Sequence, residues 1–163
     1  MILPITKLPS RILRTKTEDI SFPLSKDNTR LLRDMVDTVK KANGVGLAAP
    51  QVGKNLNLAL IYLEEAGVPP FFIINPKITS YSKELGELEE GCLSLPGVFG
   101  IVSRPLKITV EFQDTKGEKH TLTDDTFLAR VIQHEFDHLH ETLIKDKFLT
   151  ITHGHELLTQ YGE

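Results

Sequence analysis

The sequence predicts a single domain of the α+β class, and three observations support this prediction. The 163 residues suit one domain and are enough to bury a hydrophobic core. Two segments place apolar residues at helical spacing, one early in the chain and one near its end. Short apolar segments bounded by Gly, Pro and Asn lie between these two helices, as expected for strands. No repeat or linker divides the chain, so we expect one domain over residues 1–163.

The first helix is expected to begin at Ser25, after a Pro-punctuated, extended arm formed by residues 1–23. Its apolar residues recur at helical spacing: Leu31, Leu32, Met35, Val36 and Val39. Ala42-Asn43-Gly44 should end it, because Gly is favoured just past a helix C-terminus. We interpret this helix as a core-packing element without chemistry of its own.

Strands are expected at residues 56–64, 71–74, 101–112 and 119–123. The second of these should end at Asn75-Pro76, and Thr115-Lys116-Gly117 should form a hairpin turn between the last two. The acidic residues 84–90 are expected to form a solvated loop, and residues 151–163 a short helix.

The second helix carries His134, Glu135 and His138, and Asp124, Asp125 and Thr126 before it are suitable N-caps. Histidines four residues apart leave the same face of a helix, one turn apart, and can bind one divalent ion. Glu135 beside them is a candidate proton shuttle. The alternative for this motif is an ordinary amphipathic helix with a solvated polar face.

Composition excludes several other classes of function. The net charge of −3 gives no reason to expect nucleic-acid binding, and no direct sequence-specific contact is predicted. Neither a signal peptide nor an apolar segment long enough to span a membrane is recognisable, so we expect a cytoplasmic protein without a membrane partner. Cys92 is the only cysteine, which rules out a disulfide within the chain and directs attention to metal or catalytic chemistry.

Catalytic metal sites commonly use three protein ligands and leave one position for water. Cys92 could complete such a set with the two histidines, although a lone cysteine is more often a small buried residue. Glu135 would then take a proton from the water and pass it to a leaving group. Gln51 is the only side chain in the small-residue loop 44–53 that can donate hydrogen bonds, and it could stabilise an oxyanion.

Three segments together resemble the peptide deformylase family, in the family's order and at similar spacing. They are Gly44-Val45-Gly46-Leu47-Ala48-Ala49-Pro50-Gln51, Glu90-Gly91-Cys92-Leu93-Ser94 and Gln133-His134-Glu135-Phe136-Asp137-His138. Ile2-Leu3-Pro4-Ile5 and Leu13-Arg14 also resemble the family, so the likeness covers nearly the whole chain. The resemblance implies antiparallel or mixed sheets around a central helix that carries the His-Glu-x-x-His motif.

By this resemblance the protein is a metallohydrolase that removes the N-formyl group from the formylmethionine of nascent proteins. Formate would be released by attack of a water molecule activated by the metal. Cys92, His134 and His138 would bind one divalent ion, Fe²⁺ in the family and replaceable by Zn²⁺ or Ni²⁺. Glu135 would be the general acid/base, and the Gln51 side chain and the Leu93 N–H would donate to the oxyanion.

The resemblance also implies how an N-formylmethionyl peptide would bind. The peptide would lie as an added strand beside Val45, Gly46 and Gly91. The methionine pocket would be lined by three further residues, for which core packing is the alternative: Leu88, Phe127 and Val131. Glu90 and Arg104 would form a supporting pair beside the cysteine, with an ordinary surface ion pair as the alternative.

Three features depart from the family. Glu141 stands where the family usually has Gly, and Phe99 lies where some members carry Arg. Some members dock on the ribosome through a basic C-terminal helix, but no Lys or Arg follows Lys147 here, so nothing in the tail supports a transient ribosome contact. Two alternative functions stay open: a zinc endopeptidase, and a family member that binds metal or formyl peptides without efficient turnover.

Overall fold

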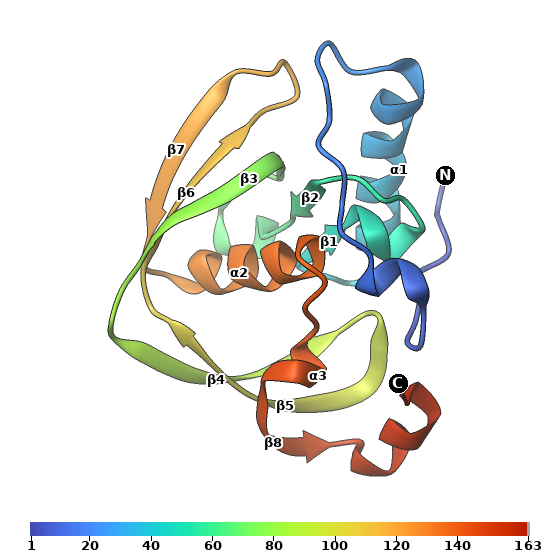
Figure 1. The fold of residues 1–163 in the computed structure, drawn as a ribbon, viewed down its shortest axis with the longest axis vertical. Helices are drawn as coiled ribbons and strands as arrows, with labels where there is room; N and C mark the ends of the chain where they lie inside the picture. The colour runs from blue at the N-terminus through green and yellow to red at the C-terminus, as the bar shows by residue number, and fades with distance from the viewer. Residues whose placement is uncertain (163) are drawn as a thin grey trace.

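The computed structural model describes residues 1–162 (Figure 1). This part of the chain contains three α-helices and eight strands, and the strands form two antiparallel sheets. The helices are α1 Lys26–Ala42, α2 Phe127–Leu139 and α3 Ile144–Lys147. The strands are β1 Gly46–Ala48, β2 Leu58–Ile61, β3 Phe71–Tyr81, β4 Leu85–Cys92, β5 Leu95–Pro105, β6 Ile108–Gln113, β7 Lys119–Asp124 and β8 Phe148–His153. Four 3₁₀ segments complete the described chain: η1 Arg11–Arg14, η2 Ala49–Val52, η3 Glu64–Ala66 and η4 His155–Tyr161. The expected α+β class is confirmed.

The larger sheet has the strand order β1-β2-β3-β6-β7 and separates the two long helices. Successive side chains of a strand point to opposite faces. Leu58 and Leu60 of β2 accordingly pack in the cluster that contains α1, whereas Ala59 and Ile61 pack in the cluster that contains α2. The alternation of one short strand therefore builds a hydrophobic core on each face of the sheet.

The smaller sheet, of order β4-β5-β8, covers the other side of α2, so that this helix crosses the middle of the molecule (Figure 1). The side of α2 toward the larger sheet is apolar, with Val131 and Ile132 buried there. The side toward β4 and β5 is polar and carries the two histidines. The central helix expected from the family resemblance is thus present.

Both long helices begin at the predicted caps. Ser25 Oγ accepts a hydrogen bond from the Asn28 N–H at the start of α1. At the start of α2, Thr126 Oγ1 accepts from the Leu128 N–H, and Asp124 accepts from two further backbone N–H groups. These side chains satisfy donors that have no partner within the helix, and they fix where α2 and its histidines begin.

Several element boundaries differ from the sequence prediction. Strand β3 does not end at Asn75-Pro76, because Asn75 adopts a φ of 51° within a β-bulge and pairing resumes at Lys77. Asn75 Nδ2 donates to the Ile20 carbonyl, and the Ile20 N–H donates back to Asn75 Oδ1, so the side chain pairs with the N-terminal arm beside the bulge.

Three further segments were predicted wrongly. Residues 84–90 are not a loop, since 85–90 form most of strand β4. Residues 101–112 are not one strand but parts of β5 and β6, which belong to different sheets. The tail forms strand β8 and the 3₁₀ helix η4 rather than one α-helix, and the last residue of that prediction, 163, lies outside the described residues. The domain extent of 1–163 stays a prediction.

Glu141 adopts the left-handed conformation that Gly favours, with a φ of 63°. The N–H groups of His140 and Thr142 both donate to the Asp137 carbonyl. Helix α2 therefore ends in the left-handed C-terminal cap that usually contains Gly at this position. The left-handed region costs a non-Gly residue roughly 1–2 kcal/mol, part of which the larger entropy of unfolded Gly offsets.

We therefore expect Glu141→Gly to raise the free energy of unfolding by about 0.5–1 kcal/mol, measured by urea titration of metal-loaded protein. Glu84→Gly is the matched control, because Glu84 is exposed and is not among the residues with positive φ. That control should lower stability. Equal effects of both substitutions would show that Glu141 is not strained.

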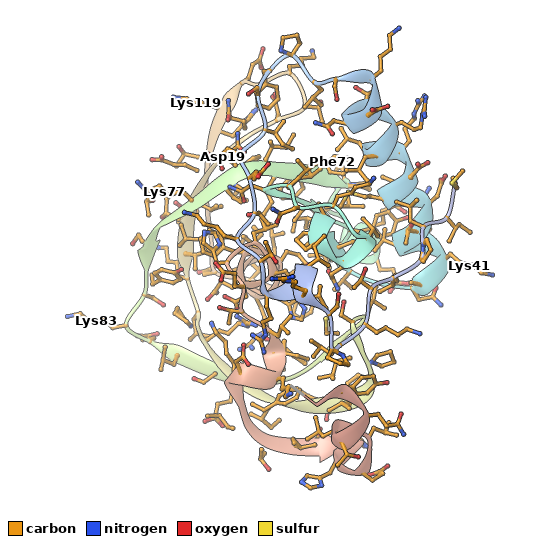
Figure 2. All side chains as sticks on the ribbon, turned by 45° about the vertical axis from the view of Figure 1, so that its right-hand side comes forward. Asp19, Lys41, Phe72, Lys77, Lys83 and Lys119 are labelled. Carbon is orange, nitrogen blue, oxygen red and sulfur yellow. The ribbon has the colours of Figure 1, made fainter. Side chains whose placement is uncertain are left out.

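Among residues 1–162, no helix is both long enough and apolar enough to cross a membrane. Charged side chains such as Lys41, Lys83 and Lys119 point outward at the periphery of the molecule (Figure 2). The polar residues described next lie instead in its interior, between α2 and the smaller sheet.

Candidate metal centre and active site

Cys92, His134 and His138 converge on one point, although the cysteine is more than forty residues from the histidines in sequence. Their candidate ligand atoms all lie within 4.8 Å of one another, and Cys92 Sγ lies 3.3 Å from His138 Nε2. The histidine rings project one turn apart from α2, with centroids 5.2 Å apart. The cysteine comes from the end of β4, which runs past this helix.

This arrangement fits a metal ion. A sulfur at about 2.3 Å and a nitrogen at about 2.0 Å from one tetrahedral ion are separated by roughly 3.5 Å, close to the observed sulfur–nitrogen distance. His138 is buried, and its Nδ1 has no hydrogen-bond partner among the described residues. The donor set of one thiolate and two imidazoles suits Zn²⁺, Fe²⁺ and Ni²⁺.

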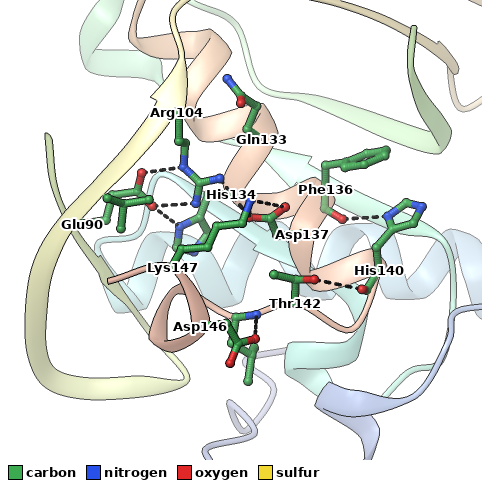
Figure 3. Close-up of polar contacts among 12 residues, drawn as sticks. Glu90, Arg104, Gln133, His134, Phe136, Asp137, His140, Thr142, Asp146 and Lys147 are labelled. Carbon is green, nitrogen blue, oxygen red and sulfur yellow. Dashed lines mark hydrogen bonds and ion pairs between the residues drawn. The ribbon is translucent and has the colours of Figure 1, made fainter. Parts of the chain in front are cut away.

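Glu90 orients the His134 ring by contacting Nδ1, the ring nitrogen that is not assigned to the metal (Figure 3). Its Oε1 lies 3.0 Å from His134 Nδ1, and since a carboxylate can only accept, that nitrogen carries the hydrogen. The other ring nitrogen is thereby left to bind the metal. Arg104 donates to both oxygens of Glu90 at 2.7 and 2.9 Å, and Arg130 donates to Oε2 at 2.7 Å.

Arg104 is 1% exposed and links two elements, because it also donates to Asp137 Oδ2 at 2.8 Å (Figure 3). The expected Glu90–Arg104 pair is therefore present, and it is a buried network rather than a surface ion pair. Burial by itself raises the pKa of Glu90, but hydrogen bonds from His134 and Arg104 hold that pKa well below its usual range. Glu90 thus stays ionised.

Two groups at this centre, the candidate ligand Cys92 and the neighbouring Glu135, have shifted pKa values that suit metal-assisted hydrolysis. Burial raises the pKa of the Cys92 thiol, yet the charge of His138 and hydrogen bonds from both histidines lower it well below the ordinary value. The sulfur is accordingly ready to act as a thiolate ligand. Burial raises the pKa of Glu135, whose Oε1 has no partner among the described residues. A carboxyl group of this kind accepts and returns a proton readily.

Gln51 points its amide toward the same centre. Its Nε2 donates to Cys92 Sγ at 3.5 Å and to Ser94 Oγ at 3.1 Å, while its Oε1 accepts from the Ala48 N–H. This hydrogen bond fixes which end of the amide faces the sulfur. Leu93 follows Cys92 directly in the turn between β4 and β5. Both predicted oxyanion donors therefore lie next to the metal ligands.

The centre opens into a cavity of about 480 Å³. All of the predicted site residues except His138 and Leu88 line it, and His138 joins the site through Cys92. Val45 and Phe127 are 45% and 49% exposed at its rim, so large apolar side chains face solvent there. A Cβ at Gly46 would lie 2.6 Å from Glu135 Oε2, so the missing side chain leaves room for this carboxylate.

Strands β1 and β4 both contribute to the cavity and are both edge strands of their sheets. An edge strand presents unpaired N–H and C=O groups, which an extended peptide can pair with. Leu88 lies on β4, 44% exposed, on the same face as Glu90 by alternation. It does not line the cavity, and its role in a methionine pocket stays a prediction.

Sequence reasoning missed Arg130 and Asp137. Both lie on the polar face of α2, four residues before and three after His134, so helical spacing could have identified them. Their partners are Glu90 and Arg104. Phe99, considered only as a departure from the family, lines the cavity together with Glu89, Pro96 and Gly97.

Arg104→Met should destabilise the protein by about 3 kcal/mol, because it removes the cation shared by the buried Glu90 and the partly buried Asp137. Lys147→Met is the matched control, since Lys147 contacts the same Asp137 from the surface, where an ion pair contributes at most about 1 kcal/mol. Urea unfolding of the metal-loaded variants compares the two. Equal losses would contradict the buried network as the main support of this site.

Comparison of the chain with known proteins gives consistent matches. Residues 2–153 match the family model described as Polypeptide deformylase. The peptide deformylase of Chlorobaculum parvum is 43% identical over 151 residues, which cover 90% of this chain and 80% of that protein. The crystal structure of a peptide deformylase from Synechococcus elongatus in complex with actinonin has a TM-score of 0.85 at 40% identity, covering 91% of this chain and 79% of that one. A probable peptide deformylase from Synechococcus phage S-SSM7 has a TM-score of 0.83 at 40% identity, covering 90% and 99%.

Proposed function

Because the chain belongs to the polypeptide deformylase family, we propose that Cys92, His134 and His138 hold its catalytic metal and that Glu135 and Gln51 act beside it. The protein is a metal-dependent amide hydrolase that removes the formyl group from an N-terminal formylmethionine and releases formate. The observation that supports the assignment of residues is the convergence of the three ligands next to a buried, unpartnered carboxylate.

A divalent ion held by these ligands supplies Lewis-acid chemistry, polarising the formyl oxygen and acidifying a water molecule. We propose Fe²⁺ as the resident ion, with Zn²⁺ and Ni²⁺ able to replace it; the mixed sulfur and imidazole donors suit all three. Glu90 supports binding by holding the His134 ring in the tautomer that the metal requires.

The chain's own groups then handle the proton and the developing charge. Glu135 takes the proton of the attacking water and delivers it to the departing amine. Its burial supports this role, because the raised pKa brings the carboxyl closer to neutral pH. Gln51 Nε2 and the Leu93 N–H donate to the oxyanion formed when the formyl carbon becomes tetrahedral. Gln51 is already oriented for this by the Ala48 N–H.

The peptide would lie between the two edge strands that border the cavity. Val45 and Gly46 on β1, and Gly91 on β4, offer main-chain groups to an extended chain. Phe127 and Val131 project from the first turns of α2 into the same cavity and would receive the methionine side chain, with Leu88 nearby on β4. Main-chain pairing would make binding tolerant of sequence, and the apolar pocket would select methionine.

Formylated nascent chains would therefore be the partners, and the cytoplasm the place of action. A reducing compartment keeps the Cys92 thiolate from oxidation, which supports this location. A transient contact with the ribosome would bring the enzyme to emerging chains. Residues 148–163 contain no Lys or Arg, so this segment offers no positive charge to such a contact.

Formate release from formyl-Met-Ala-Ser by protein purified anaerobically and loaded with Fe²⁺ tests this function. We expect formate and a free amine from the formyl peptide and no free amine from the matched acetyl peptide, since the enlarged acyl group would crowd the metal site. Cleavage of an unformylated peptide at an internal bond would favour an endopeptidase instead. Tight binding of the formyl peptide without formate release would refute the proposed catalytic roles.

A further inference from the structure

One wall of the substrate cavity is formed by Glu89 on β4 and by Pro96, Gly97 and Phe99 on β5, here called the outer wall. The C-terminal segment Thr152–Tyr161 contacts each of these four residues. The match to the family model ends at residue 153, so most of this segment lies beyond it. Figure 1 shows the segment beside the start of β5.

The first contacts involve Glu89 and Phe99. Thr152 Oγ1 donates to Glu89 Oε2 at 2.5 Å, and His153 Nε2 lies 3.7 Å from the same oxygen. His153 is paired with Phe99 in the β5–β8 ladder, and its ring meets the Phe99 ring edge-on at 6.0 Å. Strand β8 therefore fixes the orientation of two side chains at the mouth of the cavity.

The second contacts hold the turn at Pro96 and Gly97. Tyr161 Oη donates to the Pro96 carbonyl at 3.0 Å. Leu157 packs against Gly97: a Cβ added to Gly97 would lie 2.8 Å from Leu157 Cδ1. Leu157 and Tyr161 also pack against buried residues of β5, including Leu95 and Val98. The 3₁₀ helix η4 thus supports this part of the wall from behind.

The Glu89 end of the outer wall lies away from the metal ligands, whereas Pro96 follows Leu95, the β5 residue that pairs with Cys92. A strand rises about 3.3 Å per residue, so Glu89 is roughly 10 Å along β4 from Cys92. The Phe99 ring lies over Gly91, where a Cβ would come within 2.4 Å of it. A peptide whose formyl carbon is at the metal would reach the Glu89 end of this wall with the residues that follow its methionine.

We propose that the C-terminal segment is a positioning element that sets the affinity for the residues after formylmethionine and does not affect the chemical step. This inference rests on the proposed function. No hydrogen bond or ion pair described above joins this segment to a metal ligand, but Cys92 packs against the same hydrophobic cluster as Leu157 and Tyr161. Metal content is therefore measured in each variant, so that an effect through the outer wall is separated from one on the metal site.

The test compares formyl-Met-Ala-Ser with formyl-Met amide, which is too short to reach the wall. Tyr161→Phe removes only the hydrogen bond to Pro96, and Leu157→Ala removes the packing on Gly97. Each should raise KM for the tripeptide about threefold to tenfold, as expected for one lost contact. The value of kcat and the KM for the amide should stay unchanged. Gln160→Ala, an exposed change on the same η4, is the control and should alter neither constant.

An equal rise of KM for both substrates, or a fall in kcat at unchanged KM, would overturn the proposal. Tyr161→Phe keeps its ring packing, so a folded variant is expected, and its thermal melting curve verifies this. Unchanged constants in both variants would also overturn it. If the unmodified protein releases no formate from either substrate, the proposed function itself fails, and that result is distinct from an unaltered KM in the variants.

Discussion

Glu135→Gln is expected to lower kcat for formate release by about 100- to 10,000-fold, the range typical of the loss of a general acid/base. The amide keeps the size of the side chain and fits the room left by Gly46, so metal content should stay at the level of the unmodified protein. A Gln cannot take the proton of the attacking water or return one to the amine. The fall should therefore appear in kcat rather than in peptide binding.

Glu141→Gln is the matched control for this change. Glu141 is exposed just past the end of the same helix and contacts no metal ligand in the described structure. Its variant should retain full turnover. Metal analysis of both proteins accompanies the kinetics. Near-normal kcat in Glu135→Gln at full metal occupancy would exclude the acid/base role, and metal loss in that variant would show that Glu135 supports the ligands instead.

The candidate site was more predictable from sequence than the strands around it. The face shared by His134 and His138 follows from helical geometry alone. That Cys92 reaches the same point depends on the path of β4, which local periodicity does not describe. The need for a third ligand suggested Cys92, and the joint resemblance of three distant segments predicted that it converges with the histidines. In the buried network of Glu90, Arg104 and Asp137, the sequence predicts the Glu90–Arg104 pair but not the contact with Asp137. It also leaves the burial of the pair open, because an exposed ion pair and a buried one look alike in sequence.

The errors in the strands have physical causes. Asn75-Pro76 is a strong turn signal, but a bulge uses the same backbone conformation inside a strand. The segment 84–90 reads as a loop because it is rich in glutamate. As an edge strand with one face in solvent, β4 can carry such charges, while Glu90 turns inward to the arginines. Burial depends on partners that lie elsewhere in the chain.

Cys92→Ala should have the largest effect on the metal. It removes the charged ligand and leaves two neutral imidazoles, which bind a divalent ion far more weakly. Losing only a supporting partner of a ligand typically costs about 10- to 100-fold in affinity, so loss of the ligand should cost more than about 100-fold. After dialysis against a mild chelator, the variant should retain little metal, and formate release should fall in parallel.

Ser94→Ala is the control for metal retention, because Ser94 is a buried neighbour that accepts from Gln51 but offers no ligand in the observed cluster. It should keep its metal through the same dialysis. Full occupancy in Cys92→Ala would show that the thiolate is not a ligand and that the histidines bind the ion with some other group. The pH dependence of metal retention gives a second measurement: because the pKa of Cys92 is lowered, the unmodified protein should hold metal to a pH at which an ordinary thiol would already be protonated.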